Sequence, residues 1–442
     1  MNLAPLLQPA LTEQLDNGLT VIIHPIPISS AVTVDVWVQT GGRYEPDEWV
    51  GISHFLEHMV FKGTDRLAPG ELDLAIEGRG GITNAATSQD YTHYFITVAA
   101  ADLADTLPYL AEILLHASIP GDEFERERQV VLEEMRRAAD NPDYVAYHQL
   151  LQTAYQVHPY RRSVLGTAAS VMGLTPQLIR DYHQQWYQPQ QMTVVITGQL
   201  EAGQALELVK RYFGAPGASV PPSSPQIPQE SCLQEIRRCP MTLPRLEHTR
   251  LLMAWPTVSV CDWDIACGLE FLASLLGDGR TSRLTRILRE QRGWVQGVGC
   301  SSIAQQDPGL FYISSYLDPL HAEVVEATIL DQISQLQGGD LTREELERTR
   351  RILLNEFTFS TESPGQLASI FGYYDSVARW SGFTGPQMDL ASQYLETVQT
   401  MTSQRLQELA QRYLPIERYV VATLNPELSA AAATSAPQLV LC

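Results

Sequence analysis

The chain has 442 residues, of which 44% are hydrophobic, and its 30 basic residues stand against 51 acidic ones for a formal charge of −21 at pH 7. This length and apolar content exclude a disordered or fibrous chain. They are sufficient for two or three domains, each with its own hydrophobic core. The negative charge repels phosphates, so we expect no nucleic-acid partner. No apolar run of membrane-spanning length and no C-x-x-C pair occurs, which favours a soluble, cytoplasmic protein with reduced cysteines and no membrane insertion.

The spacing of apolar residues predicts regular structure along the chain. Residues 18–40 alternate β-branched and polar side chains around a proline-rich turn, which predicts a hairpin whose longer strand covers 31–39. The sequence of 121–139 predicts a helix that begins after Pro120 and ends before Asn141. Further strands are expected as a pair within 82–99 and at 191–198, and further helices at 51–62, 71–79, 102–117, 143–155 and 175–186.

The second half of the chain repeats patterns of the first half. The Trp-Tyr-x-Pro sequence at 186–189, which precedes an apolar strand, returns as Arg-Tyr-x-Pro at 412–415 before a similar strand. ERERQVVLEEM resembles LERTRRILLNEF further on, and SHFLEHM aligns with LEFLASL, in the same order. These matches indicate a tandem duplication of a unit of about 200 residues. We therefore expect homologous domains at 1–214 and 245–442, joined by a Pro- and Ser-rich linker at 215–244.

Residues 54–58 read His-Phe-Leu-Glu-His and are the sharpest functional signal in the sequence. In a helix, residues four apart lie on one face, so the imidazoles of His54 and His58 can bind one ion. A histidine pair at this spacing also arises by chance, but a glutamate directly before the second histidine is typical of inverzincins. A catalytic zinc ion keeps three protein ligands and one water, and Glu57 is placed to take the proton of that water.

A third metal ligand has to come from elsewhere, and the helix predicted at 121–139 is rich in glutamates. Its candidates are Glu123, Glu125, Glu127, Glu133 and Glu134. Glu127 and Glu134 lie two helical turns apart, on a face shared with valines that we expect to be partly buried. Spacing alone does not choose among Glu127, Glu133 and Glu134.

The run GGRYEPDEWVGISHFLEHMVFKGT, with ERERQVVLEEM downstream, resembles the pitrilysin family, and within it the mitochondrial processing peptidase and its bacterial relatives. The similarity covers most of the chain. It implies that His54, His58 and Glu134 hold one Zn²⁺ ion per chain. It also implies that Glu57 is the general base, and that Glu127 supports the catalytic site without binding the metal.

The resemblance also implies a fold class and substrate-binding residues. The fold is α+β, with two homologous domains, each a mainly antiparallel β-sheet backed by helices, which enclose a cavity. Asn84 and Ala85 match an edge strand that pairs with an extended peptide substrate. Arg289 matches an arginine that grips the substrate backbone, whereas Gln296 stands where active relatives carry a tyrosine.

These features predict a zinc metalloendopeptidase that cleaves unfolded peptides or presequence-like segments. Gln296 favours one alternative, a zinc-bearing subunit that is active only with a homologous partner. A non-catalytic scaffold is the other alternative, although scaffold relatives have typically lost parts of the zinc motif and all four of its residues are present here. A homodimer or a heterodimer with a homologous subunit is expected in either case. His93, on a predicted strand, is a further possible ligand, but we expect it to be an ordinary histidine with a hydrogen-bond partner.

Overall fold

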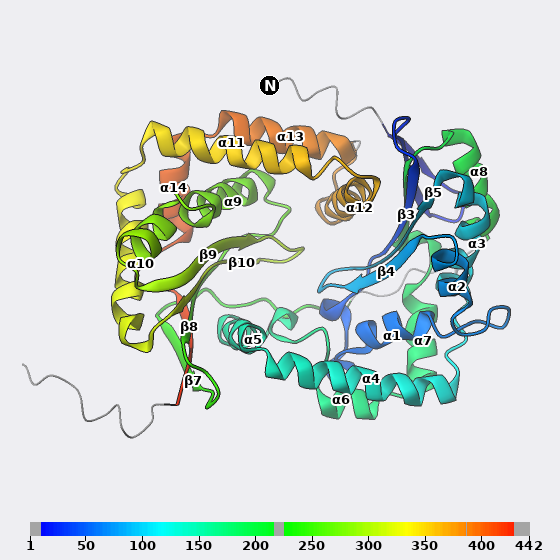
Figure 1. Ribbon diagram of the computed structural model, residues 1–442, viewed down its shortest axis with the longest axis horizontal. Helices are drawn as coiled ribbons and strands as arrows, with labels where there is room; N and C mark the ends of the chain where they lie inside the picture. Colours follow the sequence, from blue (N-terminus) through cyan, green and yellow to red (C-terminus); the bar gives the residue numbers. More distant parts are fainter. Residues whose placement is uncertain (1–9, 216–224, 386, 428–442) are drawn as a thin grey trace, which may run out of the picture. The chain divides into compact units, whose positions relative to one another are not determined.

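The computed structural model describes residues 10–215, 225–385 and 387–427. They form an α+β fold with two mixed β-sheets, each backed by helices (Figure 1). By packing, the chain divides into two compact units. The first unit contains the described residues of 1–137, 157–230 and 351–400, and the second contains those of 138–156, 231–350 and 401–442. Within the described residues, no helix combines the length and apolarity needed to cross a bilayer.

The first unit is built on a sheet of six strands in the order β1-β2-β6-β3-β5-β4. These strands are β1 (Leu11–Gln14), β2 (Thr20–Pro25), β3 (Ala31–Val38), β4 (Ile82–Thr87), β5 (Thr92–Ala99) and β6 (Met192–Gly198). Only β2 and β6 run parallel, and every other neighbouring pair is antiparallel. The sheet is therefore mainly antiparallel, and β4 lies at its edge.

The hairpin predicted at 18–40 is wrong, although both of its strands exist. Strand β6 lies between β2 and β3 and pairs with each of them, so the two strands are not neighbours. Both strands are almost wholly buried, as expected for strands in the middle of a sheet with two covered faces. The local pattern indicated two strands correctly, but their pairing depends on a segment far along the chain.

The predicted helices of the first half are all present, with ends shifted by a few residues. They are α1 (Ile52–Val60), α2 (Glu71–Glu77), α3 (Leu103–His116), α4 (Gly121–Asp140), α5 (Pro142–Ala154) and α7 (Pro176–Trp186). The structure adds α6 (Ala168–Gly173) and α8 (Ala202–Phe213). One face of the first sheet packs with α1, α3, α7 and α8 into the main apolar core of this unit.

The second unit is built on a sheet of five strands in the order β7-β11-β8-β10-β9. These are β7 (Arg237–Thr242), β8 (Thr249–Pro256), β9 (Val295–Ile303), β10 (Leu310–Leu317) and β11 (Val420–Asn425). The second half of the sequence contributes to this unit the helices α9 (Trp263–Gly277), α10 (Ala322–Gln337) and α14 (Ser403–Tyr413), and a short π-helical segment (Thr285–Gln291). The order and directions of the strands repeat those of β2-β6-β3-β5-β4, so the two sheets have the same topology.

The predicted linker lies partly outside the described residues, because 216–224 are not described. Its last part forms β7, which pairs with β11 at one edge of the second sheet. The division into domains at 1–214 and 245–442 follows the repeated patterns and stays a prediction. Packing follows a different division, since each compact unit contains segments from both halves of the sequence.

Each sheet is covered on one face by a helix from the other half of the chain (Figure 1). Helix α12 (Pro364–Ser381), which follows α11 (Arg343–Phe359) and precedes α13 (Gln387–Thr400), packs on β3 and β6 of the first sheet. Its Phe371 is buried with Ile22, Trp37 and Val195 in an apolar cluster. Conversely, α5 packs on β8 and β11 of the second sheet. The two halves of the sequence therefore depend on one another for their cores.

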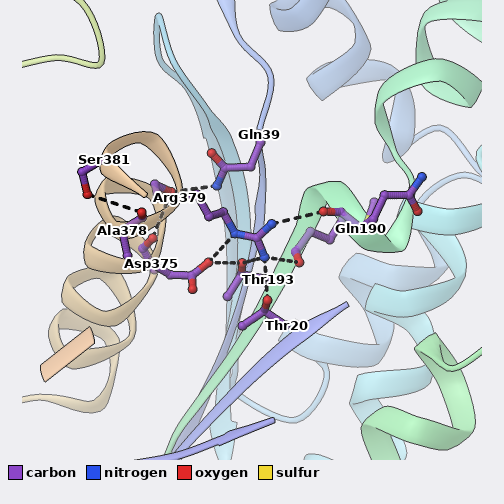
Figure 2. A network of polar contacts seen from close by, with 11 residues as sticks. Thr20, Gln39, Gln190, Thr193, Asp375, Ala378, Arg379 and Ser381 are labelled. Carbon is purple, nitrogen blue, oxygen red and sulfur yellow. Dashed lines mark hydrogen bonds and ion pairs between the residues drawn. The ribbon is translucent and has the colours of Figure 1, made fainter. Parts of the chain in front are cut away.

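Polar contacts fix α12 on the first sheet. The guanidinium of Arg379 donates hydrogen bonds to Asp375 at 2.8 Å, to the hydroxyls of Thr20 and Thr193 at 2.6 and 3.0 Å, and to the backbone carbonyl of Gln190 at 3.1 Å (Figure 2). The carboxylate of Asp375 is buried and also accepts a hydrogen bond from Thr193. Removing one side of a buried, hydrogen-bonded ion pair leaves the other charge without compensation.

Arg379→Ala is therefore expected to lower the free energy of unfolding by about 3 kcal/mol, because Asp375 stays buried without its cation. Urea unfolding followed by tryptophan fluorescence measures the change. Arg405→Ala is the control, since its ion pair with Asp264 is largely exposed and such pairs contribute about 1 kcal/mol or less. Equal shifts in both variants would contradict the role given to Arg379.

Candidate metal centre

Helix α1 has an apolar face that packs into the core and a polar face that carries the two histidines. Phe55, Leu56 and Met59 are fully buried in the core of the first unit. His54 and His58, each directly before one of these residues in the sequence, keep partly accessible side chains. Apolar residues at this spacing bury one stripe of an amphipathic helix, so the core contacts of α1 fix the direction of both imidazoles.

The N-terminus of α1 is held by a carboxylate from outside the helix. Gly51 precedes the helix in a left-handed conformation, with φ of 95°, and provides no side-chain cap. Instead the buried carboxylate of Glu45 accepts hydrogen bonds from the backbone N–H groups of Gly51 and Ser53, both at 2.8 Å. Burial raises the pKa of Glu45 to about 7, although these hydrogen bonds act to lower it. Sequence analysis missed this residue, because an acidic residue in a loop gives no local signal of a cap.

Helix α4 brings the third group to the two histidines. Phe124, Glu127 and Val131 are buried along one stripe of α4, and Phe124 packs against Phe55 of α1 with ring centroids 4.8 Å apart. Glu134 continues the same stripe one turn later. Glu133, the neighbouring alternative, is half exposed and pairs with Arg136 of its own helix.

The three side chains converge. Oε2 of Glu134 lies 3.6 Å from Nε2 of His54 and 3.5 Å from Nε2 of His58. One ligand atom from each of the three residues lies within 4.8 Å of the other two. A search of the described residues for three or more His, Cys, Asp or Glu side chains that could hold a metal ion finds these three residues.

The geometry fits a tetrahedral cation. With bonds of about 2.0–2.1 Å, two ligands of a tetrahedral zinc ion lie roughly 3.3 Å apart, close to both separations from Glu134. The Oε2 atom of Glu134 is buried and makes no hydrogen bond within the described residues. A buried carboxylate oxygen without a donor is costly, and a cation between it and the imidazoles compensates for that cost. A set of two imidazoles and one carboxylate also matches the ligands that catalytic zinc prefers.

Glu127 contacts His58 on the side of its ring away from Glu134. Its carboxylate contacts Nδ1 of His58 at 3.1 Å and the ammonium of Lys62 at 2.8 Å. Burial opposes the charged form of Glu127, but the hydrogen bonds from His58 and Lys62 outweigh it and lower its pKa. A carboxylate on Nδ1 orients the ring so that Nε2 faces the metal position, as in many metal sites.

Glu57 lies on the same helix between the two histidines. Its Oε2 accepts a hydrogen bond from the hydroxyl of Thr87 on β4 at 2.5 Å. Burial raises the pKa of Glu57, although the hydrogen bond from Thr87 acts in the opposite direction. A carboxylate with a raised pKa takes up a proton more readily than an ordinary glutamate, which suits a general base. Sequence analysis did not identify Thr87 as its partner.

The two histidines differ in their electrostatic surroundings. Burial lowers the pKa of His54 to about 3, and the neighbouring His58 adds to this effect. Burial also disfavours the charged form of His58, but its hydrogen bond to Glu127 and the charge of Glu134 outweigh burial and raise its pKa. His54 is therefore neutral at pH 7, as a metal ligand must be, whereas a metal ion has to displace any proton from His58.

The remaining predicted residues lie on three different elements. Asn84 and Ala85 are on β4, the edge strand next to Glu57, with Asn84 exposed. Arg289 lies in the π-helical segment of the second unit and pairs with its neighbour Glu290. Gln296 lies on β9 and its amide contacts the imidazole of His248. The roles of all four predicted residues stay predictions.

His93 has a structural partner. Its Nδ1 contacts the buried carboxylate of Asp35 at 3.0 Å, and its ring stacks on Trp37 with centroids 4.6 Å apart. It does not belong to the group that could hold a metal ion. This agrees with the expectation of an ordinary histidine with a hydrogen-bond partner.

Comparisons with known proteins agree with a candidate zinc site in this chain. Residues 20–168 match the model of insulinase, peptidase family M16, and residues 173–353 match that of the peptidase M16 inactive domain. The zinc protease PqqE of Helicobacter pylori is 30% identical over 363 residues, which cover 81% of this chain and 82% of the relative. The zinc protease YmxG of Bacillus subtilis is 26% identical, with 93% and 97% covered.

A solved structure gives the same result for the fold. A protease from Helicobacter pylori aligns with a TM-score of 0.88 and 26% identity, covering 95% of this chain and 100% of the other. The fold and the sequence are therefore similar to those of proteins named as proteases, two of them as zinc proteases. The chain belongs to peptidase family M16, the insulinase or pitrilysin family, which confirms the resemblance drawn from the sequence.

The assignment of the metal ligands can be tested by metal content. Purified His58→Ala and Glu134→Gln variants are expected to hold almost no zinc after dialysis, because each loses one of three ligands, while the unchanged chain holds one ion. Inductively coupled plasma mass spectrometry measures the ratio. Glu133→Gln, on the same helix, is the matched control and is expected to keep its zinc. Full occupancy in Glu134→Gln would remove Glu134 from the ligand set.

Proposed function

We propose that this chain is a zinc-dependent endopeptidase that cleaves unfolded peptides or presequence-like segments. The observation that carries the proposal is the convergence of His54, His58 and Glu134, whose ligand atoms lie within 4.8 Å of one another, with Glu57 on the same helix as the two histidines. The relatives named zinc proteases support the same class of reaction. One Zn²⁺ ion per chain is the proposed cofactor.

The chain's own residues account for the proton transfers of peptide hydrolysis. A zinc ion bound by the three ligands supplies a Lewis acid that polarises a carbonyl group and lowers the pKa of water. Glu57 accepts the proton of the attacking water as the new C–O bond forms. It then returns this proton to the leaving amine as the C–N bond breaks. Thr87 holds one carboxylate oxygen of Glu57, so the other is the oxygen that exchanges the proton.

The proposed substrate is an extended peptide chain. Strand β4 is the edge of the first sheet, so its outer backbone groups have no neighbouring strand within the described residues. Such an edge pairs with an added strand through backbone hydrogen bonds, which do not depend on the sequence of the peptide. Thr87 ends β4 and contacts Glu57, so Glu57, the proposed general base, lies beside this edge. Asn84 and Ala85 are the proposed contact residues.

The catalytic role of Glu57 gives a sharp prediction. Glu57→Gln is expected to keep one zinc ion, since Glu57 is not a ligand, and to lose at least a hundredfold in cleavage rate, since no base takes the proton. Hydrolysis of an internally quenched peptide, measured together with zinc content, tests both parts. Glu77→Gln, at the end of the neighbouring helix α2, is the control for a change of charge. An unchanged rate in Glu57→Gln would remove this residue from the mechanism.

A specific observation favours a second candidate, a zinc-bearing subunit that works only with a homologous partner. Gln296 stands at the position of the family's tyrosine and contacts His248, and Arg289 is paired with Glu290. Neither side chain is then free to bind substrate without rearranging. A partner subunit would supply the missing contact.

The two candidates differ in the activity of the purified chain. A chain active alone cleaves the quenched peptide at a rate proportional to its concentration, with chelator abolishing the signal. A partner-dependent subunit is expected to hold zinc but to remain at least tenfold less active until a homologous chain with the tyrosine is added. Gln296→Tyr is expected to raise the activity of the chain by itself if the missing tyrosine is the cause.

A further inference from the structure

A cavity of about 500 Å³ lies within the second unit, bordered by the end of α10, the start of α11 and the π-helical segment that follows α9. Its volume is within the range of sites that bind small molecules. None of its lining residues belongs to the metal centre. The charged lining residues are Arg283, Arg286, Arg348, Asp340, Glu344 and Glu345. The lining is therefore strongly charged, unlike the mostly apolar lining of a typical ligand site.

One pair of these charges is already neutralised. The side chain of Arg283 is only 5% exposed, and its Nε and Nη2 atoms donate hydrogen bonds to the two carboxylate oxygens of Glu345 at 2.7 and 3.0 Å. The backbone N–H and the hydroxyl of Thr342 also donate to Glu345. Burial acts to raise the pKa of Glu345, but the hydrogen bonds from Arg283 and Thr342 outweigh it and lower this pKa to about 2. Glu345 is therefore an anion committed to Arg283 and Thr342.

Two guanidinium groups of the lining still lack hydrogen-bond acceptors. The Nη1 atom of Arg283 is buried and makes no hydrogen bond within the described residues. Arg348 donates from Nη1 to the backbone carbonyl of Asp278 at 3.2 Å and to the hydroxyl of Thr281 at 3.0 Å. Its Nε and Nη2 atoms are buried and have no partner in the same part of the chain. A buried N–H group without an acceptor costs free energy, so an acceptor is missing here.

The positive charges beside these N–H groups are not fully balanced. Neither Arg286 nor Arg348 forms an ion pair with any described residue. Burial lowers the pKa of Arg348, although the charges of Glu345 and Asp278 act in the opposite direction. Burial thus disfavours the charged form of Arg348, and an anion in the cavity would favour it. The missing acceptor is therefore best supplied by a negatively charged group.

Phosphate is the anion that matches these donors best. Guanidinium groups bind phosphate oxygens through paired N–H donors. A phosphate group offers more acceptor oxygens than a carboxylate and carries more charge, so it can bridge several arginines at once. The hydroxyl of Thr281 accepts a hydrogen bond from Arg348, so its own proton is available to a further oxygen.

The exposed acidic residues of the lining limit the size of the ligand. Asp340 and Glu344 border the same cavity and are exposed to solvent. A long polyanion would meet both carboxylates, and the formal charge of −21 on the whole chain would repel it further. A small ligand with one phosphate group avoids most of this repulsion.

We propose that this cavity binds a phosphate group, either as free phosphate or as the end of a small phosphate ester. The phosphate oxygens accept hydrogen bonds from Nη1 of Arg283, from Nε and Nη2 of Arg348, and from the exposed Arg286. Entry of these oxygens needs side-chain adjustments of the kind that are common on binding. The bound anion joins the π-helical segment to α11. The site is separate from the metal centre and does not depend on the proposed peptidase function.

Isothermal titration calorimetry tests the proposal with the full chain at constant ionic strength. Inorganic phosphate is expected to bind at least about tenfold more tightly than acetate, because it reaches more of the arginine donors. Absence of phosphate binding, or acetate binding of equal strength, would overturn the proposal. Glycerol phosphate is titrated in parallel. Tighter binding of this ester than of phosphate supports an ester as the ligand, and weaker binding supports free phosphate.

Two variants of the cavity locate the binding. Arg348→Gln and Arg286→Gln are each expected to weaken phosphate binding about tenfold, because each removes a charged donor. Arg286 is exposed, so its substitution leaves the core intact, and thermal unfolding confirms that both variants are folded. Arg280→Gln is the matched control, since Arg280 lies nearby with a side chain 79% exposed and does not line the cavity. Unchanged affinity in both cavity variants, or an equal loss in the control, would overturn the assignment.

A variant of the metal centre separates this site from the zinc, to which phosphate can also bind. His58→Ala, which is expected to lack zinc, is expected to keep the phosphate affinity of the unchanged chain within about twofold, because the additivity of distant sites applies. Loss of phosphate binding in His58→Ala would place the anion at the metal and overturn the proposal. Failure of peptide cleavage with retained, arginine-dependent phosphate binding would contradict only the proposed peptidase function.

Discussion

The candidate metal centre depends on one constraint, which is that three side chains from two helices are held together at a spacing that suits a shared cation. The buried oxygen of Glu134 faces two imidazole nitrogens at 3.5 and 3.6 Å, distances too long for good hydrogen bonds. Desolvated polar groups without partners cost free energy, so the core must hold them in place. The packing of Phe55 against Phe124 joins the two helices directly beside the site and provides this support.

The surrounding polar groups make the same geometry useful for chemistry. Glu127 and Lys62 fix the ring of His58, Thr87 fixes one oxygen of Glu57, and Glu45 holds the start of α1. These contacts come from different parts of the chain, and each acts on the backbone or on a side chain of the one short helix α1. Precise placement of ligands by such outer contacts is how proteins tune metal affinity and reactivity.

Much of the site could be predicted from the sequence because its signal is local. The spacing of His54, Glu57 and His58 within one helix defines a single face, and the helix and the family resemblance followed from it. Spacing alone did not choose Glu134 over Glu133, and only the family resemblance did, because the physical reason lies in how α4 is rotated against α1. Glu45 was not found, since a residue that caps a helix from outside carries no fixed spacing.

The fold shows the same limit. Helices and strands were predicted within a few residues, but the hairpin at 18–40 was wrong because β6 enters between its two strands from far along the chain. Nor did any local pattern indicate that α5 and α12 cover the sheets of the opposite halves. Periodicity within a segment reports which face is apolar, but it does not report which partner covers that face.

The position of α12 in the chain has a consequence for biosynthesis. The strands of the first sheet are complete once residue 198 has been made, yet the helix that covers Ile22, Trp37 and Val195 begins only at residue 364. A ribosome therefore exposes this apolar surface on the nascent chain for the time needed to translate most of the second half. Such exposure promotes aggregation, and it lasts until α12, near the end of the chain, has emerged and packed on the sheet.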